Sequence, residues 1–245
     1  MDPNWYWLAA SGYFTSMLTA VAGMGGGVVL MALMLIPFSP AVVLPFHGAV
    51  QLVSNSSRVV LFWKHHEWRL IWRFAALLLP GAWAGLTLFQ GLPERVILLC
   101  IALAIFGSLW LKGRRFWPEA GTPLWGFWVL GFLGGALGML VGAIGYLFAA
   151  FVVRKDLSRL QVVGTLGVFS ALGHLAKIVI FGAAGFDFAA YWQPFLLMLP
   201  AMVLGTITGK YLLGRVSEIF FTRLYVGVLL VLGSKLLLWD VWLKP

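Results

Sequence analysis

The sequence predicts an all-α polytopic membrane protein of two inverted repeats, each a glycine-broken helical hairpin plus three transmembrane helices. Three observations lead to this prediction. The 245 residues are 62% hydrophobic and only 10% charged, with apolar runs of about 20 residues, the length that crosses a bilayer. A pattern of glycine, proline and tryptophan recurs at a nearly constant offset. The basic loops of the two copies occur in opposite phase along the chain.

The repeat is seen when the sequence is shifted along itself by 119 or 120 residues. The pairs that then coincide include Gly12 with Gly131, Gly48 with Gly167, Arg58 with Lys177, Trp72 with Trp192, Pro80 with Pro200 and Gly85 with Gly205. A nearly constant offset held over most of a copy is hard to obtain by chance. We therefore expect two transmembrane repeats, residues 1–115 and 116–245.

Six apolar spans follow from this division. They are expected at 41–63, 73–91 and 94–111 in the first copy, and at 160–182, 191–210 and 219–241 in the second. An odd number of spans in each copy is what an inverted second copy requires.

The basic loops support the inversion. Lys and Arg concentrate in connectors 64–73 and 112–115 of the first copy, and 154–159 and 210–215 of the second. These connectors are not equivalent in the repeat, because the counterpart of 64–73 is a stretch without Lys or Arg. All four lie on one side only if the second copy is inverted. We expect that side to face the bacterial cytoplasm, with both termini on the other side of the inner membrane.

The remaining apolar stretches, 5–37 and 122–153, are each interrupted by glycine, at 23–27 and 142–145. Each must return to the side it entered from, which predicts a hairpin of helices that meet at the glycines. The alternative is one long tilted helix that uses small residues for close packing. Asp2 precedes the first stretch and no basic residue does, so we expect no cleaved signal peptide.

The first span after the glycine cluster carries a polar stripe. His47, Gln51, Ser54, Asn55 and Arg58 share one face of an otherwise apolar helix. Polar groups without partners are costly in hydrocarbon, so the stripe is expected to face another helix or a hydrated cavity.

The equivalent span of the second copy has Ser170, His174 and Lys177 on one face, and Thr165 on the other side. None of the eight acidic residues falls in the middle of a predicted span. A cation site needs carboxylates or several carbonyls, so the pattern favours a small anion. Half-helices starting at the glycines would direct free N–H groups at it.

Two alternatives stay open for these side chains. Arg58 and Lys177 lie near opposite ends of their spans, where each could form a cationic vestibule or only extend to the membrane surface. Gln51 and Ser170 lie near the middle, as parts of a central site or as hydrogen-bonding contacts between helices.

Other classes of function are disfavoured. The net charge of +9 is explained by basic flanks of membrane spans, so nucleic acid is not an expected partner. Motifs for ATP binding or hydrolysis are absent, and a single cysteine, Cys100, rules out an internal disulfide. We expect no enzyme activity, cofactor or metal. Proton coupling would use His47 or His174, since imidazole titrates near physiological pH, and uncoupled movement down the anion gradient is equally open. A homodimer is compatible with the sequence.

The glycine cluster at 23–27, the run from His47 to Arg58, and Thr165 with His174 and Lys177 resemble the TauE/SafE sulfite exporter family of bacterial permeases. The resemblance covers almost the whole chain and implies transport of sulfite, organosulfonates or similar oxyanions. The site residues it implies, with those derived above, are Gly23, Gly25, Gly26, Gly27, His47, Gln51, Asn55, Arg58, Thr165, Ser170, His174 and Lys177. The second break departs from the first, since it has no triple glycine. An anion channel, a carrier for another small solute and a membrane assembly partner without transport activity remain alternatives.

Overall fold

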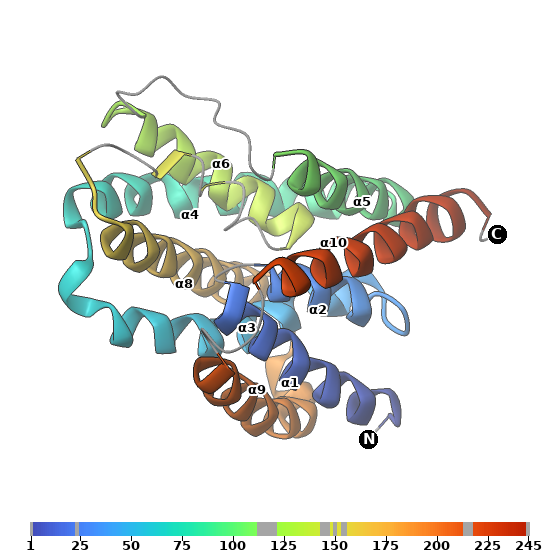
Figure 1. The fold of residues 1–245 in the computed structure, drawn as a ribbon. Coiled ribbons are helices and arrows are strands. Elements are labelled where there is room, and N and C mark those ends of the chain that lie inside the picture. Colours follow the sequence, from blue (N-terminus) through green and yellow to red (C-terminus); the bar gives the residue numbers. More distant parts are fainter. Residues whose placement is uncertain are drawn as a thin grey trace.

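The described part of the chain is helical throughout, in agreement with the predicted all-α class. A computed structural model describes residues 2–22, 25–111, 122–142, 148, 151–152, 156–212 and 218–243, and no strand occurs among them (Figure 1). The helices of the first half of the chain are α1 (Asn4–Ala22), α2 (Gly26–Met34), α3 (Pro40–Leu61), α4 (Trp68–Gly91) and α5 (Glu94–Leu111). Those of the second half are α6 (Gly126–Val141), α8 (Arg159–Ala183), α9 (Trp192–Leu212) and α10 (Glu218–Ser234), which continues as the π-helical segment η3 (Lys235–Leu243).

Several of these helices are suited to span a bilayer. Among the described residues, four segments are long and apolar enough to do so, namely Trp68–Gly91, Leu160–Ala183, Phe188–Gly209 and Val226–Leu243. They coincide with four of the six predicted spans. The other two predicted spans coincide with α3 and α5, which are helices of 22 and 18 residues. The chain is therefore a multi-pass membrane protein.

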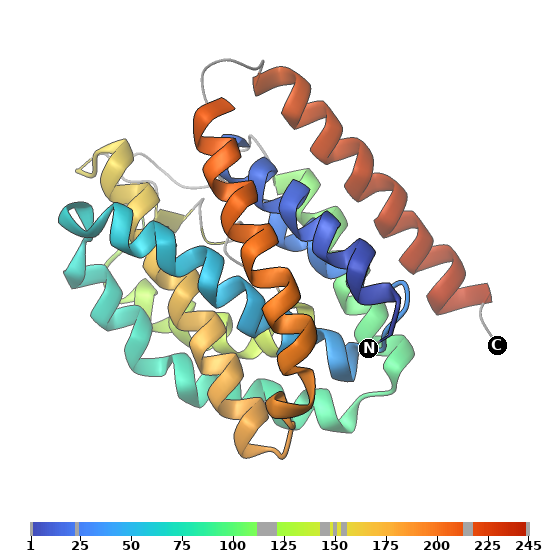
Figure 2. The ribbon, with the colours of Figure 1, turned by 90° about the horizontal axis from the view of Figure 1, so that it is seen from below.

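The helices pack around a central pair, α3 and α8, which lie side by side (Figures 1 and 2). On one flank α4 packs on α6 and on α8, and on the other α1 packs on α9, which also contacts α3. Helices α5 and α10, with η3, pack on each other at the periphery. The central pair is therefore enclosed by helices from both copies.

Glycine permits the closest of these contacts. A Cβ atom on Gly81 or Gly135, at the contact of α4 with α6, would lie 2.0 or 2.1 Å from a backbone oxygen of the opposite helix. A Cβ on Gly205, in α9, would lie 2.1 Å from the carbonyl oxygen of Tyr13 in α1. Glycines spaced four apart, as in Gly81 and Gly85, let two helix backbones touch in a membrane.

The first glycine cluster separates two helices. Helix α1 ends at Ala22 and α2 begins at Gly26, and the two pack on each other. Gly25 lies between them with φ of 104°, a conformation that side chains other than glycine rarely adopt. The stretch is thus a hairpin of two helices and not one long helix. In the second copy α6 ends at Val141, before Gly142 with φ of 79°, and residues 143–147 lie outside the described residues.

The connection from α3 to α4 lies against the start of α8 (Figure 1, at the left). A nitrogen of Arg69, Nη2, is 2.9 Å from Oδ2 of Asp156, and Nε of Arg69 is 2.9 Å from Oε1 of Glu67. The backbone N–H of Glu67 donates to Oγ1 of Thr165 at 3.1 Å. The end of α3 and the start of α8 are therefore at the same end of the molecule.

The start of α8 carries a capping box, which leads to a prediction about stability. The N–H of Gln161 donates to Oγ of Ser158, and the N–H of Ser158 donates to the side chain of Gln161. Ser158→Ala is expected to lower the free energy of unfolding by about 1 kcal/mol. Thermal unfolding in detergent measures the effect, and Ser158→Asp, which keeps a capping oxygen, should stay near wild type. Equal losses in both variants would count against the cap.

Candidate functional site

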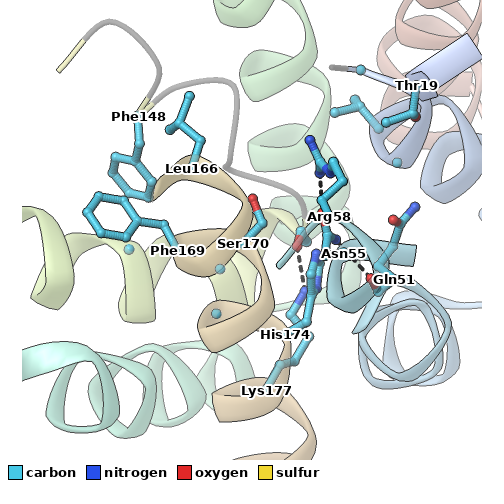
Figure 3. A pocket seen from close by; sticks show the side chains of 17 residues that line it. Thr19, Gln51, Asn55, Arg58, Phe148, Leu166, Phe169, Ser170, His174 and Lys177 are labelled. Carbon is cyan, nitrogen blue, oxygen red and sulfur yellow. Dashed lines mark hydrogen bonds between the residues drawn. The ribbon is translucent and has the colours of Figure 1, made fainter. Parts of the chain in front are cut away.

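A small, partly open cavity lies between the central helices, beside Gly25 and Gly27 of the first glycine break and Gly142 at the end of α6 (Figure 3). Its volume is about 70 Å³. Helices α3 and α8 supply most of its side chains, and the start of α2 and the end of α6 supply backbone. Its described lining is Thr19, Gly25, Gly27, Val28, Gln51, Asn55, Arg58, Gly134, Gly138, Gly142, Phe148, Leu166, Phe169, Ser170, Gly173, His174 and Lys177.

Helix α3 presents its polar stripe to this cavity. Gln51 and Asn55 are buried, with 8% and 3% of their surfaces exposed. Asn55 is held in place from both ends, because Nδ2 donates to the backbone oxygen of Gln51 at 2.8 Å and Oδ1 accepts from Nη2 of Arg58. His47, Gln51 and Asn55 of the predicted stripe are therefore internal, whereas Ser54 and Arg58 are half-buried.

Helix α8 faces the stripe with Ser170, His174 and Lys177, which Figure 3 shows on successive turns toward Arg58 and Asn55. Lys177 is 2% exposed, and its ammonium donates to the backbone oxygen of Gly142 at 2.5 Å. This oxygen belongs to the residue that ends α6, where the helix dipole is negative. Lys177 therefore connects α8 to the second glycine break.

Lys177, which is buried, and Arg58, which is half-buried, each lie against a glycine of the other half of the chain. A Cβ on Gly48 would lie 2.9 Å from Cδ of Lys177, and a Cβ on Gly167 would lie 3.5 Å from Cβ of Arg58. Because residue 48 approaches 177 while 58 approaches 167, α3 and α8 run antiparallel. The absence of a side chain at Gly48 leaves room for Lys177, whereas a Cβ on Gly167 would make only an ordinary contact with Arg58.

The cavity is positively charged. It is lined by Arg58 and Lys177, and no acidic side chain is among its described lining residues. Three acidic groups that the structure describes are paired elsewhere, namely Glu67 and Asp156 with Arg69, and Asp240 with Lys235. Two cations in a small, largely apolar space attract an anion more strongly than cations on an open surface do, because an apolar surrounding screens charge less than bulk water.

Lys177 lies deeper in the protein than the sequence-based alternatives, a vestibule near the end of its span or extension to the membrane surface, had predicted. With 2% of its surface exposed, Lys177 does not extend to the membrane surface. Arg58 and Lys177 line one cavity and do not form separate vestibules at opposite faces. Antiparallel packing of α3 on α8 places Arg58 beside Gly167 and Lys177 beside Gly48, so the two side chains enter the cavity from different ends of the helix pair.

The structure brings most of the predicted site residues together. Gly25, Gly27, Gln51, Asn55, Arg58, Ser170, His174 and Lys177 line the cavity. Gly26, His47 and Thr165 are buried but are not part of its lining, and Gly23 lies outside the described residues.

Two of the residues outside the lining have other contacts. Nε2 of His47 is 2.8 Å from the backbone oxygen of Gly27, and the ring centre of His47 is 5.7 Å from that of His174. Thr165 holds the connection before α4, as described above. Proton coupling through either histidine stays a prediction, as does a homodimer.

Sequence reasoning missed part of the lining. Gly134, Gly138 and Gly142 recur every four residues, a spacing that places them on one helix face and could have marked them. Phe148 and Phe169 gave no such signal, because apolar side chains are common throughout these segments.

Residues 8–236 match the family described as Sulfite exporter TauE/SafE, which is nearly the whole chain. Comparison with curated proteins and with solved structures finds no significant match.

Proposed function

The chain belongs to the sulfite exporter TauE/SafE family, whose members are membrane transporters of sulfur anions, and on this premise we propose that it is a secondary permease for small sulfur-containing oxyanions. The substrates are sulfite or organosulfonates, and the membrane is the bacterial cytoplasmic membrane. The observation that carries the proposal is the cavity with Arg58 and Lys177 and no described carboxylate.

The oxyanion binds in the polar half of this cavity. Sulfite and sulfonate groups have three acceptor oxygens, and the cavity offers the amide of Gln51, the hydroxyl of Ser170 and the two cations. The start of α2 at Gly25 to Gly27 adds N–H groups at the positive end of a helix dipole. Hydrogen bonds to a charged group contribute about 1.5–3 kcal/mol each.

Alternating access follows from two inverted repeats, residues 1–115 and 116–245. Helix contacts support this arrangement, since α1 packs on α9 and its repeat equivalent α6 packs on α4. The reciprocal contacts of the central glycines with Arg58 and Lys177 support it as well. The two halves rock about the cavity and expose it to either side in turn.

Orientation follows from the same arrangement. The end of the molecule with the Arg69–Asp156 ion pair faces the cytoplasm, and both termini face away from it. The ion pair supports this orientation because it joins two predicted basic loops that are not equivalent in the repeat.

Uptake of labelled sulfite into proteoliposomes tests the proposed function. Wild-type protein should give saturable uptake, and Gln51→Ala should weaken the apparent affinity by roughly 10- to 150-fold, the loss of one hydrogen bond to an anion. Gln90→Ala is a matched control because Gln90 is an exposed residue at the end of α4. Uptake that does not saturate would instead indicate a channel, and a protein that neither moves nor binds any small anion would contradict the proposal.

A further inference from the structure

The cavity has an apolar side that oxyanion binding does not use. Phe148, Leu166 and Phe169 line it there, and we call these three residues the apolar wall. In Figure 3 they gather on one side, with Ser170 between them and the polar residues of α3. None of the three carries a polar side chain.

The aromatic part of this wall is held in place by a ring behind it. Phe169 stacks on Phe74 with ring centres 4.0 Å apart and an angle of 8° between the planes. Phe148 meets the edge of the same ring at 5.7 Å. Phe148 and Phe169 are 4% and 2% exposed. The wall is therefore a preformed surface, and a ligand that lies on it does not have to order it.

The cavity, of about 70 Å³, is not completely filled by its lining side chains. A Cβ atom on Gly173, in the cavity lining, would meet no atom within 4 Å, so part of this space is open beside α8.

We propose that the apolar wall binds the organic substituent of a sulfonate, and that Phe148 and Phe169 determine substrate specificity. The inference rests on the proposed function and deepens it. The sulfonate group occupies the polar half of the cavity near Arg58 and Lys177, and a substituent of one to three carbons lies on the wall. A substituent with a second charge is disfavoured, because no described group on the wall pairs with it.

A series of alkanesulfonates tests this inference. Methane-, ethane- and propanesulfonate would compete with labelled sulfite for uptake into proteoliposomes. Each added carbon is expected to improve the apparent affinity about four-fold while the cavity has room, the gain for burying one methylene group. 2-Aminoethanesulfonate has as many non-hydrogen atoms as propanesulfonate and is expected to compete at least ten-fold less well. If the apparent affinity stays constant or falls as the chain lengthens, the inference is overturned. Equal competition by propanesulfonate and 2-aminoethanesulfonate would overturn it as well.

Two variants separate specificity from folding. Phe169→Leu keeps an apolar side chain but removes the ring, and should lower the apparent affinity for propanesulfonate more than the apparent affinity for sulfite. Gly173→Ala adds a methyl group in open space. In this variant the increase in apparent affinity should stop at a chain at least one carbon shorter than in wild type. Gly107→Ala in α5 is its control, because a Cβ there also meets no atom within 4 Å and Gly107 is not in the cavity lining.

The outcomes distinguish this inference from the proposed function. If sulfite is taken up but chain length has no effect in wild type or in Gly173→Ala, the apolar wall does not bind substrate and the proposed function stands. If neither sulfite nor any sulfonate binds, both fail. If Phe169→Leu lowers the affinity for all the anions equally, the ring has only a packing role and Phe169 does not determine specificity.

Discussion

Removing the two cavity cations together, as Arg58→Gln with Lys177→Met, is expected to weaken sulfite binding by more than about 100-fold. Each charged hydrogen bond to an anion contributes about 1.5–3 kcal/mol, so two such losses exceed two orders of magnitude even at the low end. Isothermal titration with the purified variants measures the effect. Lys64→Gln is the control, because Lys64 is an exposed cation outside the cavity.

The stability of the single variant Lys177→Met should not fall with its affinity for sulfite. A buried ammonium with no acidic partner among the described residues carries a desolvation cost, which the Met side chain does not. The thermal midpoint in detergent is therefore expected to stay level or rise while binding falls. A fall in stability that parallels the loss of binding would indicate that Lys177 has only a structural role at Gly142.

At Arg58, the size of the loss in sulfite affinity shows whether the anion is bound by positive charge alone or by two parallel hydrogen bonds. Arg58→Lys should cost less than Arg58→Ala if positive charge is what attracts the anion. The two should cost nearly the same if two parallel hydrogen bonds from the guanidinium are required.

Gly135→Val is expected to destabilise the folded protein by at least about 3 kcal/mol, at the upper end for overpacked sites. A Cβ at this position would lie 2.1 Å from the backbone oxygen of Leu78 and 2.4 Å from the backbone nitrogen of Ala82. Backbone atoms cannot move aside as a flexible side chain can, so α4 and α6 must separate. Thermal unfolding followed by size-exclusion chromatography in detergent measures the loss.

The comparison for Gly135→Val is Gly227→Val, at a position of α10 where a Cβ meets no atom within 4 Å. That variant introduces the same branched side chain into a helix, so it controls for the intrinsic preference of valine. Similar stability of the two variants would mean that the contact between α4 and α6 is looser than the structure has it.

Much of the site was predictable from the sequence because burial of polar groups in a membrane protein follows a simple rule. Gln51 and Asn55 lie on one face of an apolar helix, and hydrocarbon does not accept them, so the face had to be internal. The break between α1 and α2 was predictable for a different reason, since the basic loops share one side only if stretch 5–37 returns to the side it entered from.

Other parts of the site depended on the tertiary arrangement. The position of Lys177 in its own helix indicated the end of a span, and only packing against Gly48 in antiparallel α3 shows that it reaches the cavity. Thr165 was placed with the site by resemblance, but its hydroxyl accepts from Glu67 in a loop. Phe169 could not be distinguished from any other core residue, because one apolar side chain looks like another in a chain that is 62% hydrophobic.

The central claim is that the space between α3 and α8 binds an oxyanion, and selenite in place of sulfite tests it most directly. Anomalous diffraction from crystals grown with selenite locates selenium without prior assumptions. The account predicts one strong peak inside the cavity, within hydrogen-bonding distance of Ser170 and of at least one of Arg58 and Lys177. An empty cavity, with selenium bound elsewhere in a protein that transports selenite and sulfite, would contradict it.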